Sequence, residues 1–322
     1  MTLTLSAHII FPATDTRNKI EFHRISEVQI ERSWKEFTGR AEIILPRNVK
    51  ILNDKKYSDI FKKGDAVEIR LGYGTEQPPI EFVGYLAEIS EGVPVRLRCE
   101  DEMYQLKRGT VSVVSSNIKL KQLLERIAPG YKIDCPDMTL GAVRYSNMSP
   151  VEVLDKIKKD FMQHSYFDDN KVLHCGVIYG DQSDAPVVNI NVETNAVSES
   201  LNRKVATDDV QLKAISILKG GKKIQVTVGT KGGTSVQRTY IGITVKAELE
   251  KKARNDLKKY QVDGFDGSLT LFGIPRTEHG MKIHVKSEFY KNMEGTFYID
   301  KVIKKFSSGG YRQEVTLGDK AQ

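Results

Sequence analysis

The chain carries the same pattern of three strands twice, once in each half, and this duplication limits the folds that it can adopt. The first copy covers 64–70, 82–89 and 95–101, and the second covers 280–286, 295–303 and 312–319. In both copies apolar and polar residues alternate, as they do in strands with one face in a core and the other in water. We therefore predict two related β units. A chain that repeats one unit is expected to match a symmetry held by another molecule.

Turn residues begin or interrupt corresponding strands of the repeat. They are Gly64, Asp65, Gly84, Gly280 and Gly295. We interpret them as structural turns of the repeated unit, with no catalytic role.

The bulk properties are those of a soluble globular protein with two or three domains. The chain has 322 residues, of which 39% are hydrophobic and 28% charged, within the usual range for globular domains. Apolar runs are far shorter than the roughly 20 residues that span a bilayer, and the N-terminus shows no secretory signal pattern. We expect folding in a cytoplasm and no membrane anchor.

The distribution of turns and periodicity divides the chain into three parts. Residues 1–110 read as short strands separated by turn clusters, which favours a small antiparallel β-barrel. Residues 111–205 read as a mixed α/β middle module, and residues 206–322 as a second β-barrel with a helical insertion at about 245–260. The predicted fold class is mainly β with an α+β insertion, comprising two related small antiparallel β-barrels and a mixed α/β module.

The clearest local signal is a helix start in the middle module. Ser149 can cap free backbone amides, Pro150 suits the first helical position, and Glu152 completes a capping box. Apolar residues then recur at helical spacing, so we predict a helix over 149–163.

Candidate cofactor and metal motifs fail on spacing. The glycine-rich segment 229–235 lacks the phosphate-loop pattern. Residues 168–170 lack the glycine and glutamate of a calcium loop, so we interpret them as a hairpin turn. Three widely separated cysteines form no zinc or disulfide pattern. None of the six histidines has a familiar metal-ligand spacing, and each is interpreted as a strand or surface residue. We predict no metal and no cofactor.

Candidate catalytic groups also fail. The acidic triplet 100–102 lies on one predicted strand end, where neighbouring side chains point to opposite faces, whereas a glycosidase needs two carboxyl groups facing each other. No serine or cysteine nucleophile set is present. The sequence therefore predicts a protein that is not an enzyme.

The net charge of +7 leaves one alternative open. A small β-barrel with a basic surface can bind single-stranded nucleic acid or acidic glycans. The basic residues, however, are lysine doublets spread along the chain, with no interleaved aromatic platform. The binding module therefore stays the second hypothesis.

Three ordered stretches resemble the phage tail baseplate hub proteins, the group of late control protein D and the Mu-like tail hubs. They are the unit from Gly64 to Asp101, the helices from Leu120 to Ile157 with the segment 167–173 after them, and the unit from Gly295 to Leu317. More distantly, the chain is similar to the N-terminal part of type VI secretion spike proteins. Each motif is weak alone, but the ordered set spans nearly the whole chain.

The resemblance implies a structural role. Such hubs form a homotrimer in which six related barrels match the six-fold tail tube, with a channel for DNA or effector. The implied partners are the tail tube or tube-initiator protein and a central spike protein, with the tape-measure protein and other baseplate components as further candidates. The sequence ends soon after the second unit, so we expect the spike to be a separate protein. The implied location is a virion or injection-machine baseplate assembled in the bacterial cytoplasm. A tail-associated peptidoglycan hydrolase is a weaker option.

Overall fold

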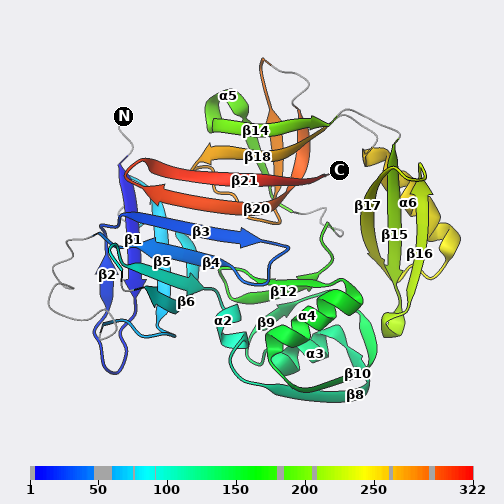
Figure 1. The fold of residues 1–322 in the computed structure, drawn as a ribbon, viewed down its shortest axis with the longest axis horizontal. Coiled ribbons are helices and arrows are strands. Elements are labelled where there is room, and N and C mark those ends of the chain that lie inside the picture. The colour runs from blue at the N-terminus through cyan, green and yellow to red at the C-terminus, as the bar shows by residue number, and fades with distance from the viewer. Residues whose placement is uncertain are drawn as a thin grey trace.

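The structure is a computed structural model. It describes residues 4–46, 60–74, 77–90, 92–179, 185–204, 209–260, 264–289 and 294–321. Strands dominate, and the helices lie mainly in two modules beside one large sheet (Figure 1). The predicted class, a mainly β chain with a mixed α/β insertion, is confirmed. No helix among the described residues is long and apolar enough to cross a membrane.

The first unit is formed by seven strands of the N-terminal third. They are β1 (Leu5–Phe11), β2 (Ile20–Phe22), β3 (Glu27–Ser33), β4 (Arg40–Ile44), β5 (Ala66–Tyr73), β6 (Ile80–Ser90) and β7 (Arg96–Glu100). Alternation places one face of each strand in a common core; Val28 and Ile30 of β3, for example, are buried. The strands pair in the order β1-β5-β6-β7-β4-β3, with β2 outside β1.

The second unit is formed by six strands that come later in the chain. They are β13 (Val187–Asn191), β14 (Ala196–Lys204), β18 (Gly264–Phe272), β19 (Lys282–Lys286), β20 (Gly295–Ser307) and β21 (Gly310–Lys320), with the short helix α5 (Val192–Asn195) joining the first two. They pair in the order β13-β19-β20-β21-β18-β14. Their apolar faces form a separate core.

The two units repeat one topology. If β1, β3, β4, β5, β6 and β7 are matched in chain order with β13, β14, β18, β19, β20 and β21, the spatial order of six strands is the same in both. Both copies also carry a register irregularity at the same place, after Leu86 in β6 and after Ile299 in β20. One difference is strand direction, because β1 is antiparallel to β5 whereas β13 is parallel to β19.

The two units belong to one continuous sheet of thirteen strands. β3 of the first unit pairs with β20 of the second, as the adjacent blue and orange arrows show in Figure 1. Among the described strands, no ladder joins β1 to β3 or β13 to β14, so each barrel-like unit stays open. The outer edge of β3 pairs with β20 of the second unit instead.

The middle module lies below this sheet in Figure 1. It contains α2 (Met103–Leu106), β8 (Val111–Lys119), α3 (Leu120–Ile127), β9 (Lys132–Asp134), β10 (Thr139–Met148), α4 (Pro150–Phe161), β11 (His164–Phe167) and β12 (Val172–Gly176). β8 pairs with β10, and β9 and β11 flank β12. The apolar faces of α3 and α4 share one core with these strands.

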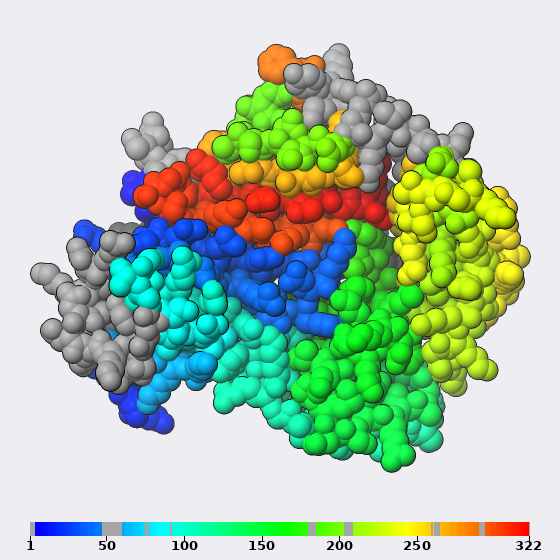
Figure 2. All heavy atoms as spheres, viewed as in Figure 1, coloured from blue at the N-terminus to red at the C-terminus, as the bar shows by residue number. Residues whose placement is uncertain are grey.

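The insertion module interrupts the second unit between β14 and β18. It contains β15 (Val210–Ile217), the short helix η2 (Lys219–Gly221), β16 (Lys223–Gly229), β17 (Thr234–Ile241) and α6 (Lys246–Tyr260), and it has its own core. Figure 2 shows it in yellow at one side of the molecule, next to the end of β21 and the middle module. The segment 229–235 lies at the β16–β17 turn, and 168–170 form the β11–β12 turn.

The module boundaries differ from the expected ones in two places. The prediction assigned 187–204 to the middle module, but β13 and β14 pair with strands of the second unit. The predicted insertion was the helix alone, whereas three strands accompany it. We therefore propose that the second unit begins near Val187. Local periodicity identifies strands, but the pairing of distant strands decides to which unit they belong.

Candidate assembly interface

The junction between the two units is an antiparallel ladder of seven residue pairs. It runs from Ser33 opposite Lys301 to Glu27 opposite Ser307. Lys301 forms an ion pair with Glu31 across the junction. Only the C-terminal half of β20 takes part, because its N-terminal half pairs with β19. A long strand therefore bridges its own unit and the neighbouring one.

Apolar contacts and indole hydrogen bonding close both ends of the junction. Phe306 and Tyr311 of the second unit are buried in the core of the first. At the other end, Nε1 of Trp34 donates a hydrogen bond to the carbonyl oxygen of Ile299 at 2.8 Å. These contacts hold the two units as one body, because each unit contributes side chains to the surroundings of the other.

A partly buried charge cluster, with Arg32, Glu81 and Lys304 at its centre, lies beside the junction and joins three parts of the chain. Its members are Arg32 of β3, Glu81 of β6, Asp169 of the β11–β12 turn, Arg276 and Glu278 between β18 and β19, and Lys304 of β20. Three cations and three carboxylates balance each other. Buried charges are tolerated only when they are paired in this way.

The cluster sets the ionisation of its own members. Burial alone would raise the pKa of Glu278, but the charges of Lys304, Arg32 and Arg276 outweigh it and lower that pKa to about 2. The neighbouring His279 is buried against the rings of Trp34 and Tyr166. Desolvation is the main cause that lowers its pKa to about 4, so the ring is neutral near pH 7.

The repeat reveals two open strand edges that match the two sides of this junction. β14 is the counterpart of β3, and β6 is the counterpart of β20. β14 is an end strand of the sheet, and among the described strands none pairs with its outer edge. On the β5 side, the ladder of β6 ends at Leu86, leaving Glu88, Ile89 and Ser90 without a strand partner on that edge within the described chain.

One exposed apolar side chain lies near each of these edges. Val93 is 77% exposed and lies seven positions after Leu86, as Phe306 lies seven positions after Ile299. Phe306 is 6% exposed because it is covered at the internal junction. Val197 on β14 is also exposed. Apolar residues at an open strand edge are typical of a surface that pairs with another chain.

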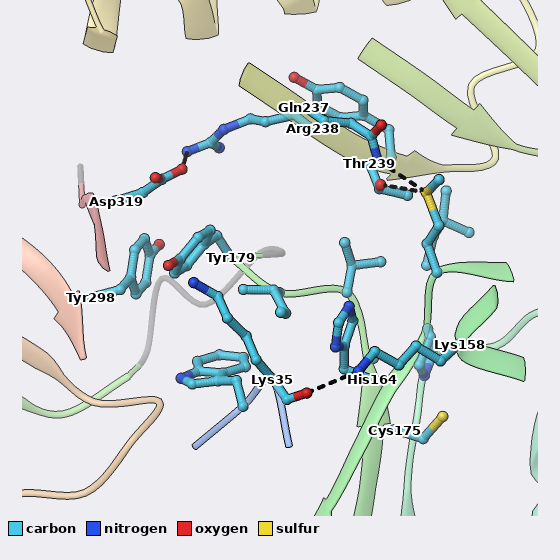
Figure 3. A pocket seen from close by; sticks show the side chains of 18 of the residues that line it. Lys35, Lys158, His164, Cys175, Tyr179, Gln237, Arg238, Thr239, Tyr298 and Asp319 are labelled. Carbon is cyan, nitrogen blue, oxygen red and sulfur yellow. Dashed lines mark hydrogen bonds and ion pairs between the residues drawn. The ribbon is translucent and has the colours of Figure 1, made fainter. Parts of the chain in front are cut away.

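One groove of the described structure contains two side chains whose pKa values are shifted by burial. It encloses about 1310 Å³ where the middle module, the insertion module and the second unit meet (Figure 3). Burial, with the charges of Lys158 and Lys35, lowers the pKa of His164 to about 4. Burial raises the pKa of the Cys175 thiol to about 12. Neither side chain is therefore poised near neutral pH as a base or nucleophile.

The insertion module is held to the second unit at the rim of this groove. Arg238 of β17 forms an ion pair with Asp319 of β21 at 3.2 Å, as the dashed line in Figure 3 marks. Tyr260 of α6 donates a hydrogen bond to the same carboxylate at 2.5 Å. Asp319 is the last residue of the second copy of the sequence repeat, and it holds the insertion module to the second unit.

Gly64 and Gly280, two of the turn residues singled out in the sequence, occupy matching positions in the two units. The N–H of Gly64 donates to the carbonyl of Leu86 at 2.8 Å, and the N–H of Gly280 donates to that of Ile299 at 3.0 Å. Both glycines have positive φ, 94° and 92°, which favours glycine. The carboxylate of Asp65 accepts hydrogen bonds from Arg17 and from the backbone N–H of Lys62.

The remaining singled-out residues have local structural positions. A Cβ on Gly84 would lie 2.1 Å from the carbonyl oxygen of Glu100, so the close approach of β6 to β7 at this position needs glycine. Gly295 begins β20. At the start of α4, Ser149 Oγ accepts from the N–H of Glu152, whose side chain accepts from the N–H of Ser149, and Pro150 is the first helical residue. The two open strand edges, at Glu88 to Ser90 and on β14, carried no sequence motif, because strand pairing uses backbone groups.

Comparison with known proteins gives matches to solved structures alone. No protein-family model matches the chain, and no curated protein matches it. A tail protein from Neisseria meningitidis MC58 is 13% identical, with a TM-score of 0.66, over 99% of this chain and 97% of that one. The 43 kDa tail protein of prophage MuSo2 from Shewanella oneidensis is 12% identical, with a TM-score of 0.63, over 98% of each chain.

A third similar structure comes from a secretion system. It is an E. coli protein described as a component of the type VI secretion system with structural similarity to the T4 bacteriophage tail proteins gp27 and gp5. It is 11% identical, with a TM-score of 0.58, over 98% of this chain and 77% of that one. The resemblance to tail hub proteins is thus confirmed at the level of the fold: this chain has the fold shared by these phage tail proteins and their type VI secretion counterpart.

Proposed function

We propose that this chain is a structural baseplate hub of a phage or phage-like tail, and that three copies form a ring of pseudo-six-fold symmetry. The observation that carries the proposal is the repeated six-strand topology, together with the internal β3–β20 junction. Full-length structural likeness to tail proteins supports the same role. The role is structural and not catalytic, in keeping with the ionisation of the groove residues.

The ring forms by repeating the internal junction between copies. β14 of one copy pairs with the free edge of β6 in the next, just as β3 pairs with β20 inside each chain. First and second units then alternate around the ring, and three chains supply six related junctions. Such head-to-tail interfaces form a closed ring when the rotation between successive copies returns to the first copy, and otherwise build an open filament. A six-fold tail tube can then bind one face of the ring and a separate spike the other, with a channel for DNA or effector between them.

The repeat also predicts the register of the new junction. Ile303 lies opposite Glu31 inside the chain. Aligning Leu86 with Ile299 makes Ser90 the counterpart of Ile303, and aligning the β3–β4 and β14–β18 ladders makes Asn202 the counterpart of Glu31. Ser90 of one copy should therefore lie opposite Asn202 of its neighbour. β6 ends sooner than β20, so the intermolecular ladder is shorter and Val93 adds apolar contact.

Paired cysteines test this geometry. Directly opposed residues in an antiparallel pair have Cα atoms about 4.5–5.5 Å apart, within disulfide range. In a Cys135→Ser background, the double variant Ser90→Cys with Asn202→Cys should form disulfides between chains on oxidation. A denaturing gel should then show cross-linked dimers and trimers and no larger species. The matched control, Glu31→Cys with Ile303→Cys, should form a disulfide within one chain and leave the mass on a denaturing gel unchanged.

Light scattering completes the test. A particle of three times 36.3 kDa, about 109 kDa, is expected in solution or on addition of the tube protein. A particle of that mass without the 90–202 cross-link would support the trimer but contradict the proposed pairing of β14 with β6. A monomer under both conditions, with no cross-link between chains, would reject the hub.

A further inference from the structure

Two histidines and a glutamate gather on the outer strands of the first unit. Nδ1 of His8 on β1 lies 3.1 Å from Oε1 of Glu21 on β2, and Nε2 of His23 lies 3.7 Å from the same oxygen. One ligand atom from each of the three residues lies within 4.8 Å of the others. The three side chains therefore converge on one point.

The β1–β2 register explains why they converge. Ile9 lies opposite Phe22 and Ile10 opposite Glu21, so continuing the ladder by one pair places His8 opposite His23. Glu21 and His23 are two positions apart and share one face of their strand. Ile9 and Phe22, in the alternate positions, are buried in the core. Strand geometry thus directs all three polar groups to the outer face.

The donor set and spacing fit one class of ion. Imidazole nitrogens and a carboxylate oxygen are zinc ligands with bonds of about 2.0–2.2 Å, and tetrahedral geometry then separates neighbouring ligand atoms by about 3.4 Å. The observed separations from Glu21, 3.1 and 3.7 Å, lie on either side of that value. We propose that His8, Glu21 and His23 bind a Zn²⁺ ion, with water in the fourth position.

Nearby charges tune the site without occupying it. Nζ of Lys19 lies 2.7 Å from Oε2 of Glu21, the oxygen that does not face the histidines. Arg70, opposite His8 on β5, is paired with Glu68. Zinc therefore competes with one exposed lysine for Glu21.

The position of the site suggests a structural purpose. β2 is three residues long and forms the end of the sheet. The β1–β2 ladder has three residue pairs, so few backbone hydrogen bonds hold β2 in place. An ion shared by β1, β2 and the residue after β2 would pin this strand in place. Bound zinc should therefore stabilise the native state.

Isothermal titration of the full chain with zinc chloride at neutral pH tests the proposal. We expect one ion per chain with Kd below about 10 μM, and a zinc-dependent rise in melting temperature. A Co²⁺ titration should give the visible absorption of a tetrahedral site. His23→Ala, which removes a 59% exposed side chain and so little packing, and Glu21→Gln should each weaken binding at least about tenfold.

Two further variants distinguish a specific zinc site from unspecific zinc binding by surface side chains. Lys19→Met should tighten zinc binding, because it removes the cation that competes for Glu21. His284→Ala on β19, a half-buried histidine outside the cluster, should bind zinc as the wild type does. Binding weaker than about 10 μM, or equal binding by His23→Ala and the wild type, would overturn the proposal.

Discussion

Lys304 and Glu81 lie 223 positions apart and form an ion pair whose side chains are 2% and 1% exposed. Lys304 belongs to the second unit and Glu81 to the first, so the pair spans the junction between them. The same ammonium also contacts Glu278. A buried cation with two carboxylates holds the units in one relative position, because any other position would leave charge without a partner.

Removing this cation should be costly. Lys304→Ala leaves Glu81 and Glu278 without their shared partner, and loss of one member of a buried pair destabilises a protein by about 3–5 kcal/mol. Urea unfolding should show that loss. Lys305→Ala, the next residue on β20 with an exposed ion pair to Glu314, should cost at most about 1 kcal/mol. Similar losses from the two variants would contradict the assigned role of the cluster.

A methyl group at Gly84 should push the neighbouring strands β6 and β7 apart. Its Cβ would lie 2.1 Å from the backbone oxygen of Glu100, and backbone atoms at that distance must separate. We expect Gly84→Ala to cost about 3 kcal/mol or more in stability, at or beyond the upper range for overpacked cores. Gly92→Ala, which meets no atom closer than 3.7 Å, is the matched control. Equal melting temperatures for both variants would show that β6 and β7 can separate at Gly84 without loss of stability.

The cap of α4 should make a smaller contribution. Ser149→Ala removes the side-chain acceptor for the N–H of Glu152 and should destabilise the middle module by about 1 kcal/mol. Ser200→Ala, at an exposed position of β14, should change stability little. Hydrogen exchange of the α4 amides would localise the effect. An unchanged exchange rate in the first turn of Ser149→Ala would contradict it.

Acid should weaken the fold through His279. Its pKa of about 4 in the native state lies below the unfolded value near 6.5. The unfolded chain therefore takes up a proton that the folded chain does not, and stability falls as the pH drops from about 6.5 to 4. Glu278, Arg32, His174 and Lys304 are the charged or titratable groups that act on this ring.

A shape-preserving variant isolates this effect. In His279→Phe, the slope of unfolding free energy against pH in that window should decrease by up to about 1.4 kcal/mol per pH unit. The aromatic packing against Trp34 and Tyr166 is retained. His164 should still contribute its own slope, because its pKa is also lowered to about 4. Identical slopes for the variant and the wild type would show that His279 does not titrate on unfolding.

The metal cluster shows how tertiary arrangement adds what spacing along the chain lacks. The spacing of residues along the chain matches no metal-ligand motif, so by sequence His8 and His23 are interpreted as ordinary strand or surface residues. Glu21 and His23 are two positions apart, but His8 joins them through the β1–β2 register. Cross-strand sites depend on pairing between segments, so a search along one segment does not detect them.

The sequence by itself determined the repeated strand pattern, the capped helix and the mainly β class, because these follow from local periodicity and turn chemistry. Only the tertiary structure decided that β13 and β14 belong to the second unit and that β3 pairs with β20. It also decided that, among the described strands, none pairs with the outer edge of β14 or with the end of β6 after Leu86 on the β5 side. Strand pairing is made by backbone groups that every residue shares, so the choice of partner is set by the packing of whole units and not by residue identity along the chain.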